Sequence, residues 1–243
     1  MNSRSPDRCF FAGLSTCLVG AQIVLDEQES RHLVGVRRHR VDDHVNVIDG
    51  QGALAGARIT AISRKTGVTL EIQKLRHEMK PARQVHIACA VPKGDRMQTL
   101  LDMATQIGVS SVTPLVFERS QPESRKPKTE RWQRVVIESI KQSRRLYLTE
   151  LGSMSSLQDW LDSPSRTEGL RLLADASGVS PSGIDTEEQN VYVLIGPEGG
   201  LSHAEKDQVI GLGFVPLRLS DNILRIETAV VAAASVLSGS SAT

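Results

Sequence analysis

Aromatic side chains are scarce in this chain of 243 residues, at 3% of the total. This scarcity disfavours a nucleic-acid surface built from many rings that stack on bases. Cysteines are also few: Cys9, Cys17 and Cys89 form no CxxC pair, and an odd number cannot complete a disulfide framework. The cysteine pattern therefore predicts a reducing, cytoplasmic location, and its spacing predicts no metal site.

Long apolar runs are missing as well. No stretch of ~18 uninterrupted apolar residues occurs, so the sequence predicts no membrane-spanning helix. Hydrophobic residues make up 40% and charged residues 23%, which is ordinary for a globular protein. The length fits one large domain or two modest ones.

The net charge of +1 hides an asymmetry along the chain. Residues 1–150 hold 24 Lys and Arg against 16 Asp and Glu, whereas residues 151–243 hold 5 against 12. A basic region of this kind suggests an anionic partner such as RNA. A solvated charged surface explains the charge alone equally well.

Two domains are predicted, at 1–76 and 83–243, with the polar segment 76–83 as a linker. The first is expected to be a small β-barrel, because Gly-rich turns separate its short strands. Its expected strands are 17–25, 44–48, 54–62 and 68–72, with a short helix at 27–36. The second alternates strands and helices, which predicts an α/β domain with a mainly parallel sheet. Its expected strands are 85–91, 112–117, 170–174, 191–195 and 214–219, and its helices 94–107, 129–145, 202–212 and 227–237.

The clearest motif is the segment VYVLIGPEGGLS at 191–202. A buried strand leads into a glycine loop and then into a helix, whose start is marked by the capping-box spacing of Ser202 and Glu205. Glycines let a ligand approach the backbone, and open α/β sheets place ligands at strand ends. The loop is neither GxGxxG nor GxxxxGK[ST], which argues against a nicotinamide-dependent dehydrogenase. By itself it could also be a tight connection.

The second motif is LSDNILRIETA at 219–229, which enters an apolar helix. Arg225 and Glu227 stand at the mouth of that helix. Glu227 could simply stabilise the helix N-terminus, and Arg225 could pair with an acid such as Glu198. The sequence predicts that this segment and the glycine loop fold together around one pocket.

The two motifs together resemble those of the RsmE-type small-subunit ribosomal RNA (uracil-N3)-methyltransferases of the SPOUT class. Further residues across nearly the whole chain carry the resemblance: Arg8 and Phe10, His32 and Arg37, Asp49-Gly50, Lys93–Arg96, Ile107–Val109, Glu118–Ser120, Gln142 and Arg145. It implies a PUA-like β-barrel followed by a trefoil-knotted α/β domain. It also implies S-adenosylmethionine as cofactor and a homodimer. The implied substrate is a uridine in the decoding region of 16S rRNA, within the small ribosomal subunit.

The resemblance assigns residues to the expected site. By analogy the cofactor is expected at Leu173, Asp175, Ile195, Gly196, Pro197, Glu198, Gly200, Leu219, Ile223, Leu224 and Ile226. The catalytic candidates are Arg225, Arg145 and Glu198, with Arg225 proposed to stabilise negative charge that develops on the uracil. Phosphate contacts are expected from Arg8, Arg37, Arg38, Arg40, Arg125, Lys126 and Lys128.

This chain departs from the family pattern at two notable positions. Asn222 stands where the family usually has Arg, and Met103 where it usually has Lys. These departures leave open a non-catalytic RNA-binding protein on the same fold. A methyltransferase of the same class acting on another RNA, such as a 2′-hydroxyl of transfer RNA, is the other alternative.

Overall fold

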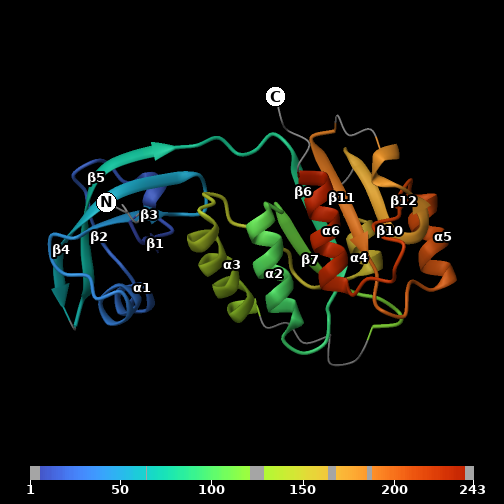
Figure 1. The fold of residues 1–243 in the computed structure, drawn as a ribbon, viewed down its shortest axis with the longest axis horizontal. Coiled ribbons are helices and arrows are strands. Elements are labelled where there is room, and N and C mark those ends of the chain that lie inside the picture. The colour runs from blue at the N-terminus through green and yellow to red at the C-terminus, as the bar shows by residue number, and fades with distance from the viewer. Residues whose placement is uncertain (1–5, 64, 121–128, 164–167, 185–187, 239–243) are drawn as a thin grey trace. The chain divides into compact units, whose positions relative to one another are not determined.

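The computed structural model describes residues 6–63, 65–120, 129–163, 168–184 and 188–238. The chain divides into two compact units. The first combines Met1–Lys80 with Ile140–Leu148, and the second combines Pro81–Ser139 with Thr149–Thr243 (Figure 1). The domain limits 1–76 and 83–243 stay a prediction, and the first unit also takes in a segment from the middle of the chain. Within the described residues, no helix is long and apolar enough to cross a membrane.

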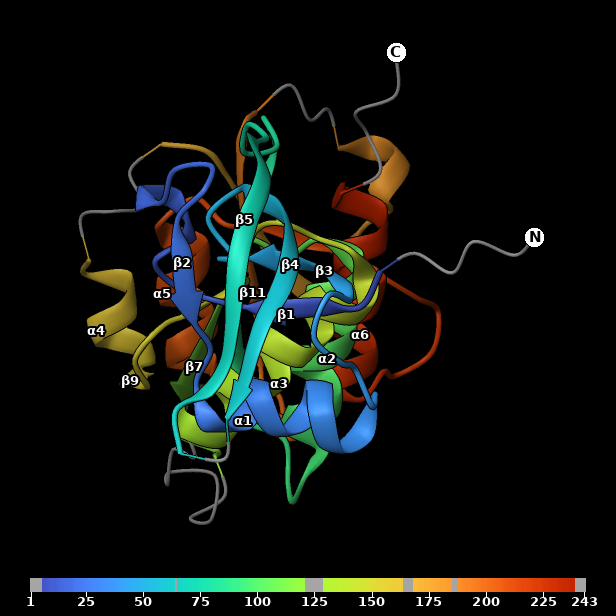
Figure 2. The ribbon, with the colours of Figure 1, turned by 90° about the vertical axis from the view of Figure 1, so that its left-hand side faces the viewer.

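The first unit is built on a five-stranded sheet in the order β1-β3-β4-β5-β2 (Figure 2). Its strands are β1 (Arg8–Phe10), β2 (Gln22–Val24), β3 (His44–Ile48), β4 (Ala53–Ser63) and β5 (Gly67–His77). β1 pairs with β3 in parallel, and the other pairs are antiparallel. Inward-facing residues of β4 alternate with outward-facing ones, so that Ala53, Ala55, Ala57 and Ile59 are fully buried in its core.

Two local expectations for this unit need correction. The strand expected at 17–25 forms only at Gln22–Val24, because a turn precedes it: the Ala21 N–H donates to the Leu18 carbonyl at 3.0 Å, and Gly20 has a left-handed φ of 89°. The helix expected at 27–36 is a short α1 (Glu27–Arg31), capped by Asp26, that continues as a π-helical turn over His32–Val36.

The end of α3 (Thr129–Ser143) belongs to the first unit. Lys141 Nζ lies 2.7 Å from Glu29 Oε1 of α1, and these two side chains are only 3% and 5% exposed. The other Glu29 oxygen accepts a hydrogen bond from the Phe10 backbone N–H at 3.0 Å. The helix was expected to reach residue 145 but ends at Ser143, since Arg144 takes a left-handed φ of 62°.

The second unit contains a seven-stranded sheet in the order β12-β10-β11-β6-β7-β8, with β9 also paired to β7. Its strands are β6 (Gln84–Ala90), β7 (Ser111–Val116), β8 (Glu150–Leu151), β9 (Ser155–Ser156), β10 (Leu170–Val179), β11 (Asn190–Ile195) and β12 (Val215–Leu217). All of the pairings are parallel, which confirms the predicted α/β class. The trefoil knot stays a prediction.

The remaining helices are α2 (Arg96–Ile107), α4 (Leu157–Leu161), α5 (His203–Gly211) and α6 (Ile226–Ser238). The last of these, α6, contacts α2 and packs on β6 and β11 (Figure 1). Its apolar residues Val230, Ala233 and Ala234 are fully buried, as its sequence indicates. This packing fixes the start of α6, and with it the loop that precedes the helix, above the sheet.

Candidate functional site

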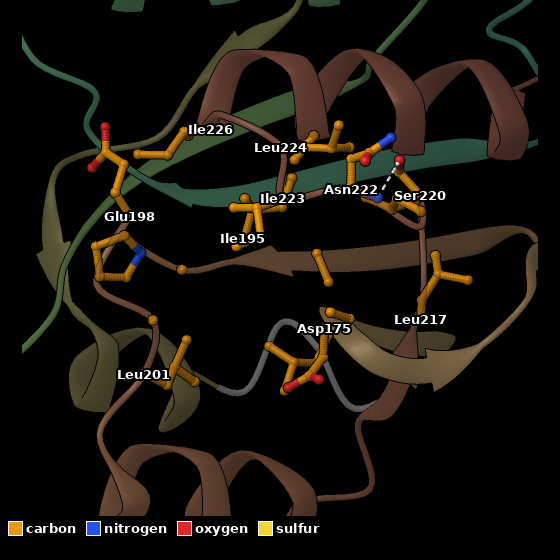
Figure 3. A pocket seen from close by; sticks show the side chains of 18 of the residues that line it. Asp175, Ile195, Glu198, Leu201, Leu217, Ser220, Asn222, Ile223, Leu224 and Ile226 are labelled. Carbon is orange, nitrogen blue, oxygen red and sulfur yellow. Dashed lines mark hydrogen bonds between the residues drawn. The ribbon is translucent and has the colours of Figure 1, made fainter.

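A pocket of about 340 Å³ opens at the carboxyl ends of β11 and β12 and beside the middle of β10, the strand between them (Figure 3). This is the place where open parallel sheets bind ligands, and the volume falls in the small-molecule range. The lining residues are Leu173, Ala174, Asp175, Ala176, Ile195, Gly196, Pro197, Glu198, Gly200, Leu201, Lys206, Leu217, Leu219, Ser220, Asn222, Ile223, Leu224, Ile226 and Ala229.

All eleven residues that the sequence analysis assigns to the cofactor line this one pocket. The glycine loop and the segment before α6 meet there, which confirms that the two motifs fold together. Their role in holding a cofactor stays a prediction. The sequence analysis missed other lining residues, among them Ala176, Lys206 and Leu217, because they lie outside the segments that carry the two motifs.

The glycine loop between β11 and α5 is held in a tight conformation. Gly200 has a left-handed φ of 69° and donates its N–H to the Pro197 carbonyl at 2.8 Å. A side chain at Gly196 would collide with Leu201. The predicted capping box is present: the Ser202 N–H reaches Glu205 Oε2 at 2.8 Å, and the Glu205 N–H reaches Ser202 Oγ at 3.3 Å.

Glu118 and Arg119, which follow β7, form hydrogen bonds that hold the glycine loop and the start of α5 in place. Arg119 donates from one guanidinium nitrogen to the Gly199 carbonyl at 3.0 Å and to the Leu201 carbonyl at 3.3 Å. The Glu118 N–H donates to Glu205 Oε1 at 2.8 Å. Both residues lie in a stretch singled out by the resemblance, and the structure gives Arg119 a positioning role at the loop.

Asp175 brings a negative charge to the pocket beside β10. Lys206 lies 2.6 Å from one carboxylate oxygen, and the Ser177 N–H and hydroxyl donate to the other at 2.8 and 2.6 Å. Although burial acts to raise it, the pKa of Asp175 falls to about 2 because these hydrogen bonds and the Lys206 charge favour the carboxylate. Asp175 therefore remains charged at neutral pH.

Arg96, at the start of α2, joins the two motifs electrostatically. Its guanidinium lies 3.3 Å from Glu198 of the glycine loop and 3.5 Å from Glu227 in the first turn of α6. The second oxygen of Glu227 is buried and has no hydrogen-bond partner among the described residues. The sequence analysis offered Arg225 as a partner for Glu198, but the ion pair is made by Arg96.

The arginines proposed for catalysis do not line the pocket. Arg225 is exposed, and its carbonyl accepts the Ala229 N–H at 2.8 Å in the first turn of α6. Arg145 belongs to the first unit, where burial lowers its pKa. Glu198 alone among the three catalytic candidates lines the cavity.

The residues expected to contact RNA fall into two groups. Arg37, Arg38 and Arg40 are exposed on the first unit, and half-buried Arg8 donates to the Arg145 carbonyl at 3.2 Å. The second group, Arg125, Lys126 and Lys128, lies outside the described residues.

Comparison with known proteins defines the class to which this fold and pocket belong. A family described as the RNA methyltransferase domain matches residues 78–238, and the RNA methyltransferase PUA domain matches residues 25–73. The chain therefore belongs to the RNA methyltransferase family with an N-terminal PUA-like domain.

Individual relatives are similar over nearly the full chain. The ribosomal RNA small subunit methyltransferase E of Aquifex aeolicus is 32% identical over 221 residues, which cover 90% of this chain and 94% of the relative. The structure of the Neisseria gonorrhoeae methyltransferase E bound to S-adenosyl methionine superposes with a TM-score of 0.85 at 27% identity, covering 96% of each chain. A putative methyltransferase of Legionella pneumophila with bound SAM gives 0.86 at 27% identity, covering 96% of this chain and 97% of the other.

Proposed function

We propose that this chain is an S-adenosylmethionine-dependent methyltransferase that methylates N3 of a uridine in the decoding region of 16S rRNA, within the small ribosomal subunit. The observation that carries the proposal is the single pocket shared by the glycine loop and the segment before α6. The similarity to methyltransferase E proteins, two of them solved with the methyl donor, supports the same function.

The pocket suits S-adenosylmethionine in shape and charge. Ile195, Leu219 and Leu224 offer apolar surface for an adenine ring, and the glycine loop allows close approach of backbone groups. Asp175 and Glu198 offer carboxylate oxygens to the positive sulfonium and ammonium groups of the ligand, although each already pairs with a cation of the chain, Lys206 and Arg96. When bound, S-adenosylmethionine supplies a methyl group on a sulfonium that is its own leaving group, so the protein's main task is orientation.

Methylation of uridine N3 also requires that its proton be removed. When N3 gives up its proton to a base, negative charge spreads over N3, O2 and O4 of the ring, and transfer of the methyl group to N3 then removes that charge. We assign Arg225 the task of stabilising this charge, with Arg145 as the second candidate. N3 lies on the Watson–Crick edge, so a paired uridine must be freed from its partner before it reacts.

RNA binding is assigned to the basic first 150 residues. Arg8, Arg37, Arg38 and Arg40 would contact phosphates, as would Arg125, Lys126 and Lys128. Affinity for the small subunit should then fall steeply with salt. We further propose that the enzyme acts in the cytoplasm as a homodimer.

The test is methyl transfer to small subunits isolated from a strain that lacks this enzyme. Incubation with labelled S-adenosylmethionine should give one labelled uridine, identified as N3-methyluridine by nucleoside mass spectrometry and mapped to the decoding region. Label on another base, on a ribose or on transfer RNA would overturn the proposal.

A non-catalytic RNA-binding role is the second candidate, because Asn222 replaces the usual Arg and lines the pocket. Calorimetry separates the two functions. A catalytic protein binds S-adenosylmethionine, whereas a non-catalytic homologue binds small subunits but not the methyl donor.

A further inference from the structure

A second recess, of about 240 Å³, lies within the first unit and is separate from the pocket at the strand ends. Its walls come from four separate segments: the start of β1, the turn after α1, the strand β3 and the end of α3. Of the described residues that line it, Arg8, Arg37, Lys141 and Arg144 are cationic, and Asp7 is the acid.

These charges do not cancel within the recess. The Asp7 carboxylate lies 3.7 Å from the Arg37 guanidinium and 3.0 Å from the His39 ring. The charge of Lys141 is neutralised by buried Glu29. The pKa of Arg8 is lowered, first by burial and then by the positive charge of Arg144. Arg8 and Arg144 line the same recess, so two positive charges border one small volume, and a bound anion would offset their repulsion.

The backbone conformation of Arg144 is a second, independent observation. It follows the last residue of α3 with a left-handed φ of 62°, a position where helices usually place Gly or Asn. An arginine there costs roughly 1 kcal/mol relative to glycine. Backbone strain of this kind, which a glycine would relieve, points to a function for the arginine side chain.

We infer that this recess is an anion site that seats one phosphodiester of the bound RNA strand between Arg8 and Arg144. The inference rests on the proposed RNA substrate. It adds Arg144 to the predicted contacts and makes Arg8 part of a built site rather than of a general basic surface. The guanidinium groups of both residues suit the paired oxygens of a phosphate.

The experiment uses the full-length protein and two small probes, followed by amide NMR shifts at residues 140–148. The dinucleoside monophosphate UpU carries one phosphodiester, and inorganic phosphate is the free-anion comparison. The variant is Arg144→Gly, and the charge-matched control is Arg31→Gln, which removes an exposed arginine of the same unit that pairs with Glu27 on α1.

The expected result is saturable UpU binding to the wild type and to Arg31→Gln, weakened roughly tenfold in Arg144→Gly by the loss of a charged hydrogen bond. Thermal unfolding should show Arg144→Gly at least as stable as the wild type, so weaker binding would not reflect misfolding. Unchanged UpU binding in Arg144→Gly, or binding of inorganic phosphate alone, would overturn the inference. Methyl transfer by the wild type to small subunits, measured beside this titration, reports on the proposed function separately.

Discussion

The guanidinium of Arg96 lies 3.3 Å from the carboxylate of Glu198, across 102 residues of sequence. The same group reaches Glu227 at 3.5 Å. One arginine of α2 thus ties the glycine loop to the first turn of α6, and both of these border the pocket. The side chain of Glu227 is 12% exposed and that of Glu198 is 45% exposed. Because water surrounds the Glu227 carboxylate less, removal of the Arg96 cation should destabilise Glu227 more than Glu198.

Replacing Arg96 should lower both the stability of the protein and its affinity for the cofactor. Arg96→Ala leaves both carboxylates without this cation, and we expect a stability loss of about 1 kcal/mol and a several-fold weaker affinity for S-adenosylmethionine. Calorimetric titration and chemical denaturation measure the two effects. Arg131→Ala, which removes a more exposed pair with Asp95 at 3.3 Å, is the matched control. Equal affinity in both variants would show that Arg96 does not position the loop.

The Asp175–Lys206 pair should make stability depend on acid pH. The pKa of Asp175 falls from 3.8 to about 2 on folding, so its contribution is present above about pH 4 and disappears as the pH falls toward 2. Because Lys206 is 40% exposed, we expect Asp175→Asn to cost only about 1 kcal/mol at pH 7. Denaturation from pH 7 to pH 2 should show this difference shrinking; a constant difference would contradict the assignment.

Removing one partner of the buried ion pair between Glu29 and Lys141 should lower the free energy of unfolding strongly. Lys141→Met leaves the Glu29 carboxylate buried without its cation, and we expect a loss of about 3 kcal/mol in urea denaturation. The double variant Glu29→Gln/Lys141→Met should recover much of that loss, since no charge is then stranded and the glutamine can still accept the Phe10 N–H. A double variant no more stable than Lys141→Met would count against the pair.

Arg225 should act on turnover and not on cofactor binding. Its side chain is exposed and does not line the pocket, so Arg225→Ala should keep the wild-type affinity for S-adenosylmethionine. Turnover at saturating cofactor should fall by about a hundredfold if Arg225 stabilises the developing charge. Arg218→Ala, which loses only an exposed contact to Asp221 at 3.4 Å, is the control. Wild-type turnover in Arg225→Ala would remove Arg225 from the mechanism.

The sequence predicted the parts of the molecule whose signals are local. The strand 44–48 and the capping box at Ser202 and Glu205 were predicted correctly, because alternation and cap spacing act within a few residues. The two-residue strands β8 and β9 and the five-residue helix α4 were missed, since elements so short show no period.

The sequence could not predict contacts between distant segments. Arg225 was offered as a partner for Glu198 because it stands in the neighbouring motif, whereas the fold brings Arg96 there from α2. The left-handed Arg144 was equally hidden, since a glycine would ordinarily mark such a helix end. Residues that pair with their sequence neighbours were therefore easier to predict than those that close the pocket.

The most direct test of the account is a calorimetric titration of S-adenosylmethionine into a variant with a filled pocket. Ala176 is an exposed residue that lines the pocket from β10, so Ala176→Trp occupies the cavity without disturbing the core. Val179→Trp, at an exposed position of the same strand, is the control. We predict binding by the wild type and Val179→Trp and at least tenfold weaker binding by Ala176→Trp; a wild type that does not bind, or an Ala176→Trp variant that binds equally well, would contradict the account.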